Sequence, residues 1–279
     1  MFVMKKIIHI LTTFMGLIIV LTACKPDVAS LGATLNKSAL KFSVTPDPAN
    51  PNNFVLQSLT PNVTPYWVTP TGKSINVTDT VNFPFPGTDT IYYSVESAGG
   101  IVAADPHVVT VNSIDAKTVS DSNWVNLSGG LGNSKTWRLD VNSIGASKYF
   151  NGPIYFAGAS YSWEWDAGWA SWICPAGEYG TMTFDLIGNA NLTVNNKMYP
   201  SFSGAGKFML NTKTQKLTTF GVDILHDSTS GQGASIPNFR TNLTIKSLTA
   251  DHMQLVGVNT TNGNWIIYNY ISQQYYDTH

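Results

Sequence analysis

A short stretch near the middle of the chain combines aromatic and acidic side chains. The sequence YSWEWDAGWASW, residues 161–172, holds half of the eight tryptophans together with two carboxylates. In an extended strand, successive side chains point to opposite faces, so Trp163 and Trp165 are expected on one face and Glu164 and Asp166 on the other. The pattern is compatible with a hydrolase active site, a sugar-stacking platform or a core strand.

The residues that follow favour recognition of a carbohydrate. Glycine and proline become frequent after Asp166, which indicates a loop that carries Trp169 and Trp172. A large exposed aromatic side chain on a loop commonly marks a binding surface, because the C–H faces of sugars pack on an indole ring while carboxylates accept hydrogen bonds from their hydroxyls. We expect Trp169 and Trp172 to form the platform. The candidate carbohydrate-binding residues are Trp163, Glu164, Trp165, Asp166, Trp169 and Trp172.

The same residues allow a second interpretation, a glycoside hydrolase. Such enzymes use two carboxylates, one of which donates a proton to the leaving group. The segment EWDAGW resembles the E-x-D-x-x-E strand motif of jelly-roll β-glucanases, and Glu164 and Asp166 match its first two positions. Trp169 stands where the acid should be, and Glu178 would replace that acid only if the loop folded back. We therefore predict no catalytic residue and a protein that is not an enzyme.

Other chemistry has weaker support in the sequence. Asp223, His226 and Asp227 are close enough in sequence to suggest a calcium site, but the group lacks further ligands, and we predict neither a metal site nor a cofactor. Zinc-ligand spacing, a glycine-rich phosphate loop and a Ser-His-Asp order are absent from the sequence. Cys174 lies in an apolar stretch and is expected to be a buried, unreactive thiol.

The N-terminus predicts export and lipid anchoring. Residues 1–23 carry two lysines near their start, Lys5 and Lys6, and continue as an apolar run that is shorter than the roughly 20 residues of a spanning helix, which is typical of a signal peptide. The run ends in LTAC, which resembles a bacterial lipobox, so Cys24 is the expected lipidation site. Residues 24–38 form a polar spacer behind that anchor, which would attach the protein to a membrane through acyl chains.

Composition narrows the class of protein. The formal net charge is −1 and there is no lysine or arginine cluster, so we expect no nucleic-acid partner. Asn, Thr, Ser, Gly and aromatic residues are plentiful while only 12% of residues are charged, which favours an all-β protein that binds an uncharged ligand. With Cys24 lipidated, Cys174 has no partner for an intrachain disulfide.

The chain divides into two β-patterned parts. Residues 39–114 alternate short strands with turns and predict an immunoglobulin-like sandwich, and residues 115–123 are polar and predict a linker. Residues 124–279 contain a longer series of strand patterns without a convincing helical period. We expect them to form a larger jelly-roll-like sandwich, which is the carbohydrate-binding domain.

Several segments carry a family resemblance. TDTVNFPFPGTDTIYYSVESAGG is similar to the later half of a PKD repeat. NSKTWRLD, the aromatic cluster, YGTMTFDL and IKSLTADHMQLVGVNTTNGNWIIYNYI resemble, in this order, the two-domain glycan-binding lipoproteins of Bacteroidota polysaccharide-utilisation loci. The resemblance implies capture of polysaccharide at the surface of the outer membrane, beside a TonB-dependent importer. A structural or adhesion lipoprotein that binds a protein partner is the remaining alternative.

Overall fold

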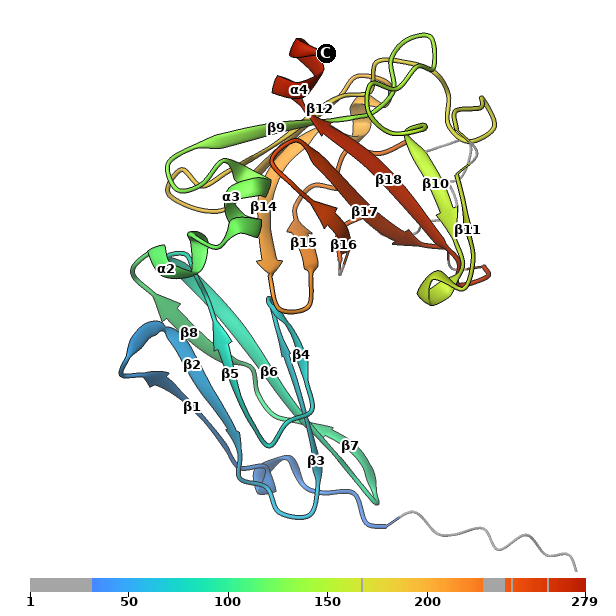
Figure 1. Cartoon of the computed structure of the whole chain (residues 1–279). Coiled ribbons are helices and arrows are strands. Elements are labelled where there is room, and N and C mark those ends of the chain that lie inside the picture. Colours follow the sequence, from blue (N-terminus) through green and yellow to red (C-terminus); the bar gives the residue numbers. More distant parts are fainter. Residues whose placement is uncertain (1–31, 167, 228–238, 242, 260) are drawn as a thin grey trace, which may run out of the picture.

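The computed structural model describes residues 32–166, 168–227, 239–241, 243–259 and 261–279 (Figure 1). The predicted signal peptide (residues 1–23) and the predicted lipidation site Cys24 lie outside the described residues. In the part of the chain that is described, no helix has the length and apolar character needed to cross a membrane. We call residues 32–114 the N-terminal module and residues 115–279 the C-terminal module.

The N-terminal module is built from two antiparallel sheets that share one core. Its elements are η1 (Lys37–Ala39), β1 (Phe42–Asp47), β2 (Asn50–Ser58), β3 (Thr64–Thr69), β4 (Gly72–Ser74), β5 (Thr78–Asn82), β6 (Gly87–Ser97), β7 (Gly100–Ala103) and β8 (His107–Val111). One sheet has the order β1-β2-β5, and the other has the order β4-β3-β6-β7 with β8 paired to β6. Alternate residues of both sheets, among them Leu56, Trp67 and Tyr93, are buried between them. The sandwich expected from the sequence is therefore present.

Within its described residues, the C-terminal module contains a longer sheet and three short α-helices. Its elements are α2 (Ala116–Val119), α3 (Ser122–Ser128), β9 (Ser134–Leu139), β10 (Ile154–Ala157), η2 (Ala159–Tyr161), β11 (Glu164–Trp165), β12 (Gly180–Asp185), β13 (Asn191–Asn196), η3 (Pro200–Phe202), β14 (Gly204–Asn211), β15 (Lys216–Phe220), β16 (Leu243–Leu248), β17 (His252–Val258), β18 (Trp265–Ser272) and α4 (Gln273–Thr278). The prediction of an all-β fold with more than one sheet is confirmed.

Within the described residues, the sheet of the C-terminal module closes on itself. From β12 to β18, each strand pairs with the next one along the chain, and β9 pairs with both β12 and β18. The result is a closed, barrel-shaped meander, filled by one apolar core that includes Trp137, Phe184 and Tyr270. The strands pair with their sequence neighbours, whereas a jelly roll has connections that cross between sheets, so the jelly-roll topology expected from the sequence is not the one observed. The physical reason is that strands consecutive in sequence pair most readily with each other.

The long segment between β9 and β12 adds two strands outside the closed sheet. β10 pairs with the first half of β18, from Trp265 to Tyr268, and β11 pairs with β10. β9 pairs with the second half of β18, from Tyr270 to Ser272. One edge of β18 thus serves two different strands, and β10 and β11 extend the sheet on that side (Figure 1).

The polar segment 115–123, expected to be a linker, is largely helical. Asp115 caps α2 by accepting a hydrogen bond from Thr118 N, and Asp121 caps α3 by accepting one from Asn123 N. Gly129 ends α3 in the left-handed conformation that glycine favours. The residues that cap these helices are short and polar, so they also fit the composition of a linker. For this reason the sequence analysis did not predict the two helices that join the modules.

Asp115 also ties the two modules together. Its carboxylate accepts hydrogen bonds from Asn50 Nδ2 (2.8 Å), Asn82 Nδ2 (2.9 Å) and Thr118 Oγ1 (2.8 Å). Burial alone would raise the pKa of Asp115, but these hydrogen bonds and the one from Thr118 N lower it to about 2. The ionised form is therefore favoured in the folded protein, and it links β2 and β5 to α2.

We predict that Asp115→Asn destabilises the protein by about 2 kcal/mol at pH 7. Since the folded-state pKa lies below the ordinary value, the contribution of the carboxylate is complete above about pH 4 and is lost as the pH falls toward about 2. Urea denaturation at pH 7 and at low pH measures the difference. Asp105→Asn, at an exposed carboxylate paired with Lys37, is the control and should cost little. An equal deficit at both pH values would contradict the assignment.

Candidate functional site

The aromatic stretch lies on the strands that extend the closed sheet. Phe156 of β10 is paired with Trp165 of β11, and Ala157 is paired with Glu164. Since paired residues share a face, Phe156 and Trp165 point to one side of the sheet and Ala157 and Glu164 to the other. Phe156 belongs to the core of the closed sheet, so Trp165 extends that core toward solvent.

Three aromatic rings form the central feature of the site. The ring centroids of Phe156, Trp165 and Trp172 lie 5.6–6.1 Å from one another, and their planes are within 27° of parallel. These distances mean that each ring is displaced sideways from the next, as in offset stacking. Phe156 is buried, whereas Trp165 is 49% and Trp172 is 50% exposed. We call these three residues the platform: a stepped apolar surface with a buried base.

The opposite face of β10 and β11 carries a connected group of polar side chains beside a small apolar cluster that includes Ala157 and Ile267. Lys246 of β16 donates a hydrogen bond to Tyr155 Oη and forms an ion pair with Glu164 Oε1 at 3.0 Å. Its ammonium group also lies 4.6 Å from the ring centroids of both Tyr155 and Tyr161. Burial lowers the pKa of Lys246 from its ordinary value. Glu164 is therefore held in an ion pair on the face opposite the platform.

The turn between β10 and β11 has an unusual backbone conformation and carries several aromatic side chains. Ser160 and Tyr161 have φ values of 55° and 58°, a region that non-glycine residues rarely adopt. Tyr161 packs edge-to-face on Trp265, with centroids 4.6 Å apart. Trp163, half-exposed, lies so close to Gly158 that a Cβ there would be 2.6 Å from its ring. The turn thus displays two further exposed aromatic side chains, and Tyr161, which contacts Lys246 and Trp265, lies on the face opposite the platform.

Trp169 is partly buried and is not part of the exposed platform, contrary to the expectation from the sequence. Its ring packs against Gly145 and the core, and its Nε1 donates a hydrogen bond to Cys174 O at 3.2 Å. A Cβ at position 145 would lie 2.5 Å from the ring, so glycine is what permits this contact. Because the indole is half-buried with its N–H satisfied, Trp169 anchors the loop that presents Trp172.

The candidate carboxylates, Glu164, Asp166 and Glu178, each interact with a different partner. Asp166 is exposed and accepts a hydrogen bond from Gly168 N at 3.2 Å, which is a turn-forming contact. Glu178, considered as a replacement acid, pairs with Arg138 of β9. Glu164 pairs with Lys246. Each of Glu164 and Glu178 thus has its own cation.

Sequence reasoning missed two residues of the site, Phe156 and Lys246. Phe156 reaches it through the local pairing of β10 with β11, whereas Lys246 reaches it from β16, which is distant in sequence, through the pairing of the closed sheet. The apolar run IYFA of β10 is typical of a strand that is enclosed on both faces, and all four of its residues are buried in the structure. The sequence contained no local signal for the pairing of Lys246 with Glu164.

The candidate calcium ligands are occupied by other interactions. Asp223 pairs with Arg240 and lies 3.6 Å from His226 Nε2, while Asp227 accepts a hydrogen bond from Tyr268 Oη at 2.6 Å. The pKa of Cys174 is raised to about 12, mainly by burial and to a smaller extent by the nearby charge of Asp227. The buried position and the raised pKa agree with an unreactive thiol. Among the described residues, no group of three acidic, histidine or cysteine side chains is arranged to hold a metal ion.

Comparisons with known proteins do not assign this chain to a family. No protein-family model matches the chain, and no curated protein matches it in sequence.

We predict that Gly145→Ala destabilises the protein far more than Gly263→Ala. Both glycines have positive φ (83° and 74°), but a Cβ meets the Trp169 ring only at position 145 and meets nothing within 4 Å at position 263. The backbone cost of about 1 kcal/mol is shared, and overpacking adds about 2 kcal/mol at position 145. Chemical denaturation of both variants measures the difference. Equal destabilisation would show that Trp169 does not anchor the loop through this contact.

Proposed function

We propose that this protein is a lipid-anchored outer-membrane protein that captures neutral polysaccharide at the cell surface without hydrolysing it. The observation that carries the proposal is the platform, in which two half-exposed tryptophans lie nearly parallel over a buried phenylalanine. Such a surface matches the flat apolar faces of sugar rings, and its offset rings suit consecutive sugars of a chain.

The rigid mounting of the rings also supports binding. Trp165 is held by strand pairing with Phe156, and Trp172 follows a loop that is fixed by Trp169. Rings that are already placed lose little conformational entropy when a ligand binds. Trp163 is a further half-exposed aromatic side chain in the neighbouring turn, where it can contact another sugar of a bound chain.

Charge near the platform favours an uncharged ligand. On the opposite face, the charges of Glu164 and Lys246 neutralise each other. Asp166 is exposed and able to accept hydrogen bonds from sugar hydroxyls. A polyanion would find no cluster of cations here among the described residues, whereas a neutral glycan finds aromatic faces and hydrogen-bond acceptors.

A binding role accounts for the carboxylates better than hydrolysis does. A glycosidase needs one carboxylic acid that holds a proton and a second carboxylate across the scissile bond. Glu164 pairs with Lys246 and Glu178 pairs with Arg138, so each carboxylate is already engaged in an ion pair of its own. We therefore propose that the site holds glycan for other proteins, in keeping with the resemblance to glycan-binding lipoproteins beside TonB-dependent importers.

We predict that replacing both Trp165 and Trp172 by alanine abolishes binding to neutral polysaccharide. Loss of two stacking surfaces is expected to weaken binding by at least about 30-fold, or about 2 kcal/mol. Affinity gels containing β-glucan, xylan, galactomannan or amylopectin measure retention of the purified protein. Tyr92→Ala removes an equally exposed aromatic ring from the N-terminal module and should leave retention unchanged. The proposal fails if no gel retards the wild type, or if the double variant is retarded as strongly.

Incubation with the retained polysaccharide should release no reducing ends. Wild type and Glu164→Gln should bind equally, because Glu164 lies on the face opposite the platform and is engaged by Lys246. A reducing-sugar assay on both proteins makes the comparison. Release of reducing ends by the wild type that disappears in Glu164→Gln would establish the hydrolase alternative instead.

A further inference from the structure

The strand that carries Trp165 is joined to the sheet by few backbone contacts. β11 consists of Glu164 and Trp165, and among the described strands it pairs with β10 alone. One further backbone hydrogen bond, from Gly158 N to Trp163 O at 2.8 Å, closes the turn between the two strands. A short hairpin is only marginally stable unless side chains pack against it. The place of Trp165 in the platform therefore depends on the side chains that hold β11.

The turn that precedes β11 also needs support, because its backbone is strained. Ser160 and Tyr161 both have positive φ, and residues other than glycine keep this conformation only where surrounding contacts fix it. Tyr161 is fixed by its edge-to-face contact with Trp265 and by the ammonium group of Lys246, which lies 4.6 Å from its ring centroid. Lys246 thus helps to hold the turn.

Lys246 contacts each part of the β10–β11 hairpin. Its ammonium group donates a hydrogen bond to Oη of Tyr155 on β10, lies against the ring of Tyr161 in the turn, and pairs with Glu164 on β11 at 3.0 Å. Tyr155 and Glu164 are 91 and 82 residues away from Lys246 in sequence. All three contacts lie on the face opposite the platform. One side chain of β16 therefore links both strands and the turn of the hairpin to the closed sheet.

A shift in strand register marks the position of Lys246. β16 pairs with β17 at Ile245 and at Ser247, but Lys246 between them has no directly paired residue on β17. A bulge of this kind re-aims the side chain of the extra residue, and bulges are common beside functional sites. The Lys246 side chain is only 25% exposed, so its ammonium group is held at the hairpin instead of extending into solvent.

We propose that Lys246 is a positioning residue for the platform: it holds β11 and the turn from the opposite face and thereby keeps Trp165 parallel to Phe156 and Trp172. The inference rests on the proposed function, since it gives Lys246 a role in glycan binding without contact between Lys246 and the glycan. Without the ammonium group, β11 is less ordered in the free protein. A glycan then has to order the strand as it binds, which lowers the affinity.

Fluorine NMR of the full chain labelled with 5-fluorotryptophan tests the position of Trp165 without any ligand. Lys246→Met keeps a long apolar side chain but removes the ammonium group, so the signal of Trp165 should shift and broaden. The signals of the fully buried Trp67 and Trp137 should stay where they are in the wild type. Lys246→Arg, which retains a cation beside Glu164, should restore the Trp165 signal.

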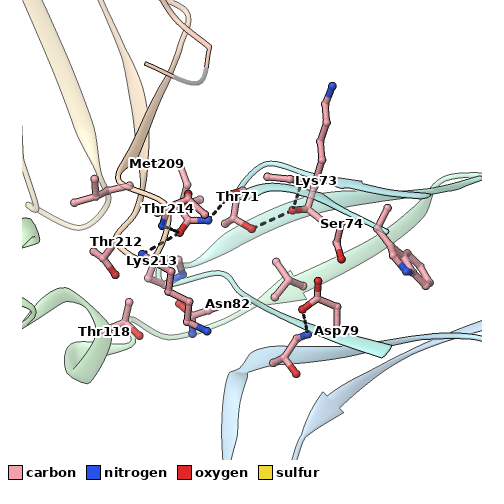
Figure 2. Close-up of a pocket in the computed structure, with 18 of the residues that line it drawn as sticks. Thr71, Lys73, Ser74, Asp79, Asn82, Thr118, Met209, Thr212, Lys213 and Thr214 are labelled. Carbon is pink, nitrogen blue, oxygen red and sulfur yellow. Dashed lines mark hydrogen bonds between the residues drawn. The ribbon is translucent and has the colours of Figure 1, made fainter. Parts of the chain in front are cut away.

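Lys73→Met is the matched control. Lys73 belongs to β4 of the N-terminal module, and Figure 2 shows its side chain extended away from the other labelled residues. Loss of its ammonium group should change neither the Trp165 signal nor the binding of glycan.

Affinity for the polysaccharide that retards the protein in gels is the second measurement. Lys246→Met should bind it about 5- to 10-fold more weakly, because β11 has to be ordered on binding. Lys246→Arg should recover the affinity. Glu164→Gln keeps a side-chain oxygen that accepts from Lys246, in agreement with the unchanged binding expected for that variant.

Two results would overturn the proposal. One is a Trp165 signal in Lys246→Met that matches the wild type, and the other is an unchanged affinity of Lys246→Met for the retained polysaccharide. If Lys246→Met does not fold, Tyr155→Phe replaces it, with the same expected changes, because it removes only the hydroxyl that accepts from Lys246. If no polysaccharide retards the wild type, the proposed function fails, whereas the NMR comparison still decides whether Lys246 positions Trp165.

Discussion

The division of one edge of β18 between two strands determines where the site is built. Backbone N–H and C=O groups of a strand need partners, and an edge without partners is exposed to unwanted pairing. β9 reaches only the stretch from Tyr270 to Ser272, which closes the sheet, and leaves the stretch from Trp265 to Tyr268 for β10. The segment between β9 and β12 must therefore return to this edge. In doing so it brings Phe156 and Trp165 to the rim of the core.

The loop tryptophans then have different tasks that follow from their burial. Trp169 packs on Gly145 with its N–H satisfied, so it gives the loop a fixed position. Trp172 has no comparable enclosure and lies beside Trp165 with half of its surface exposed. Exposure of two adjacent large aromatic rings is costly for a surface that binds nothing, because apolar area in water is unfavourable. A sugar chain across these rings would remove that cost.

Local patterns made much of the fold predictable. Alternation identified most strands of the C-terminal module, and it placed Glu164 and Trp165 on opposite faces, as β11 has them. The helices in 116–128 were missed although Asp115, Asp121 and Gly129 are all capping residues, because the polar composition was taken as a linker. The closure of the sheet, the pairing of β10 with β18 and the contact of Trp169 with Gly145 join residues distant in sequence, and no local pattern encodes them. Which loop tryptophan is exposed was therefore not predictable.

Fluorine NMR of protein labelled with 5-fluorotryptophan tests the central claim most directly, because each of the eight indoles gives its own signal. The spectrum is recorded during titration with the polysaccharide that retards the protein in affinity gels, and signals are assigned by single substitutions. The account predicts that the signals of Trp165 and Trp172 shift together with saturation, while those of the buried Trp67 and Trp137 do not. Unchanged Trp165 and Trp172 signals in the presence of bound polysaccharide would contradict it.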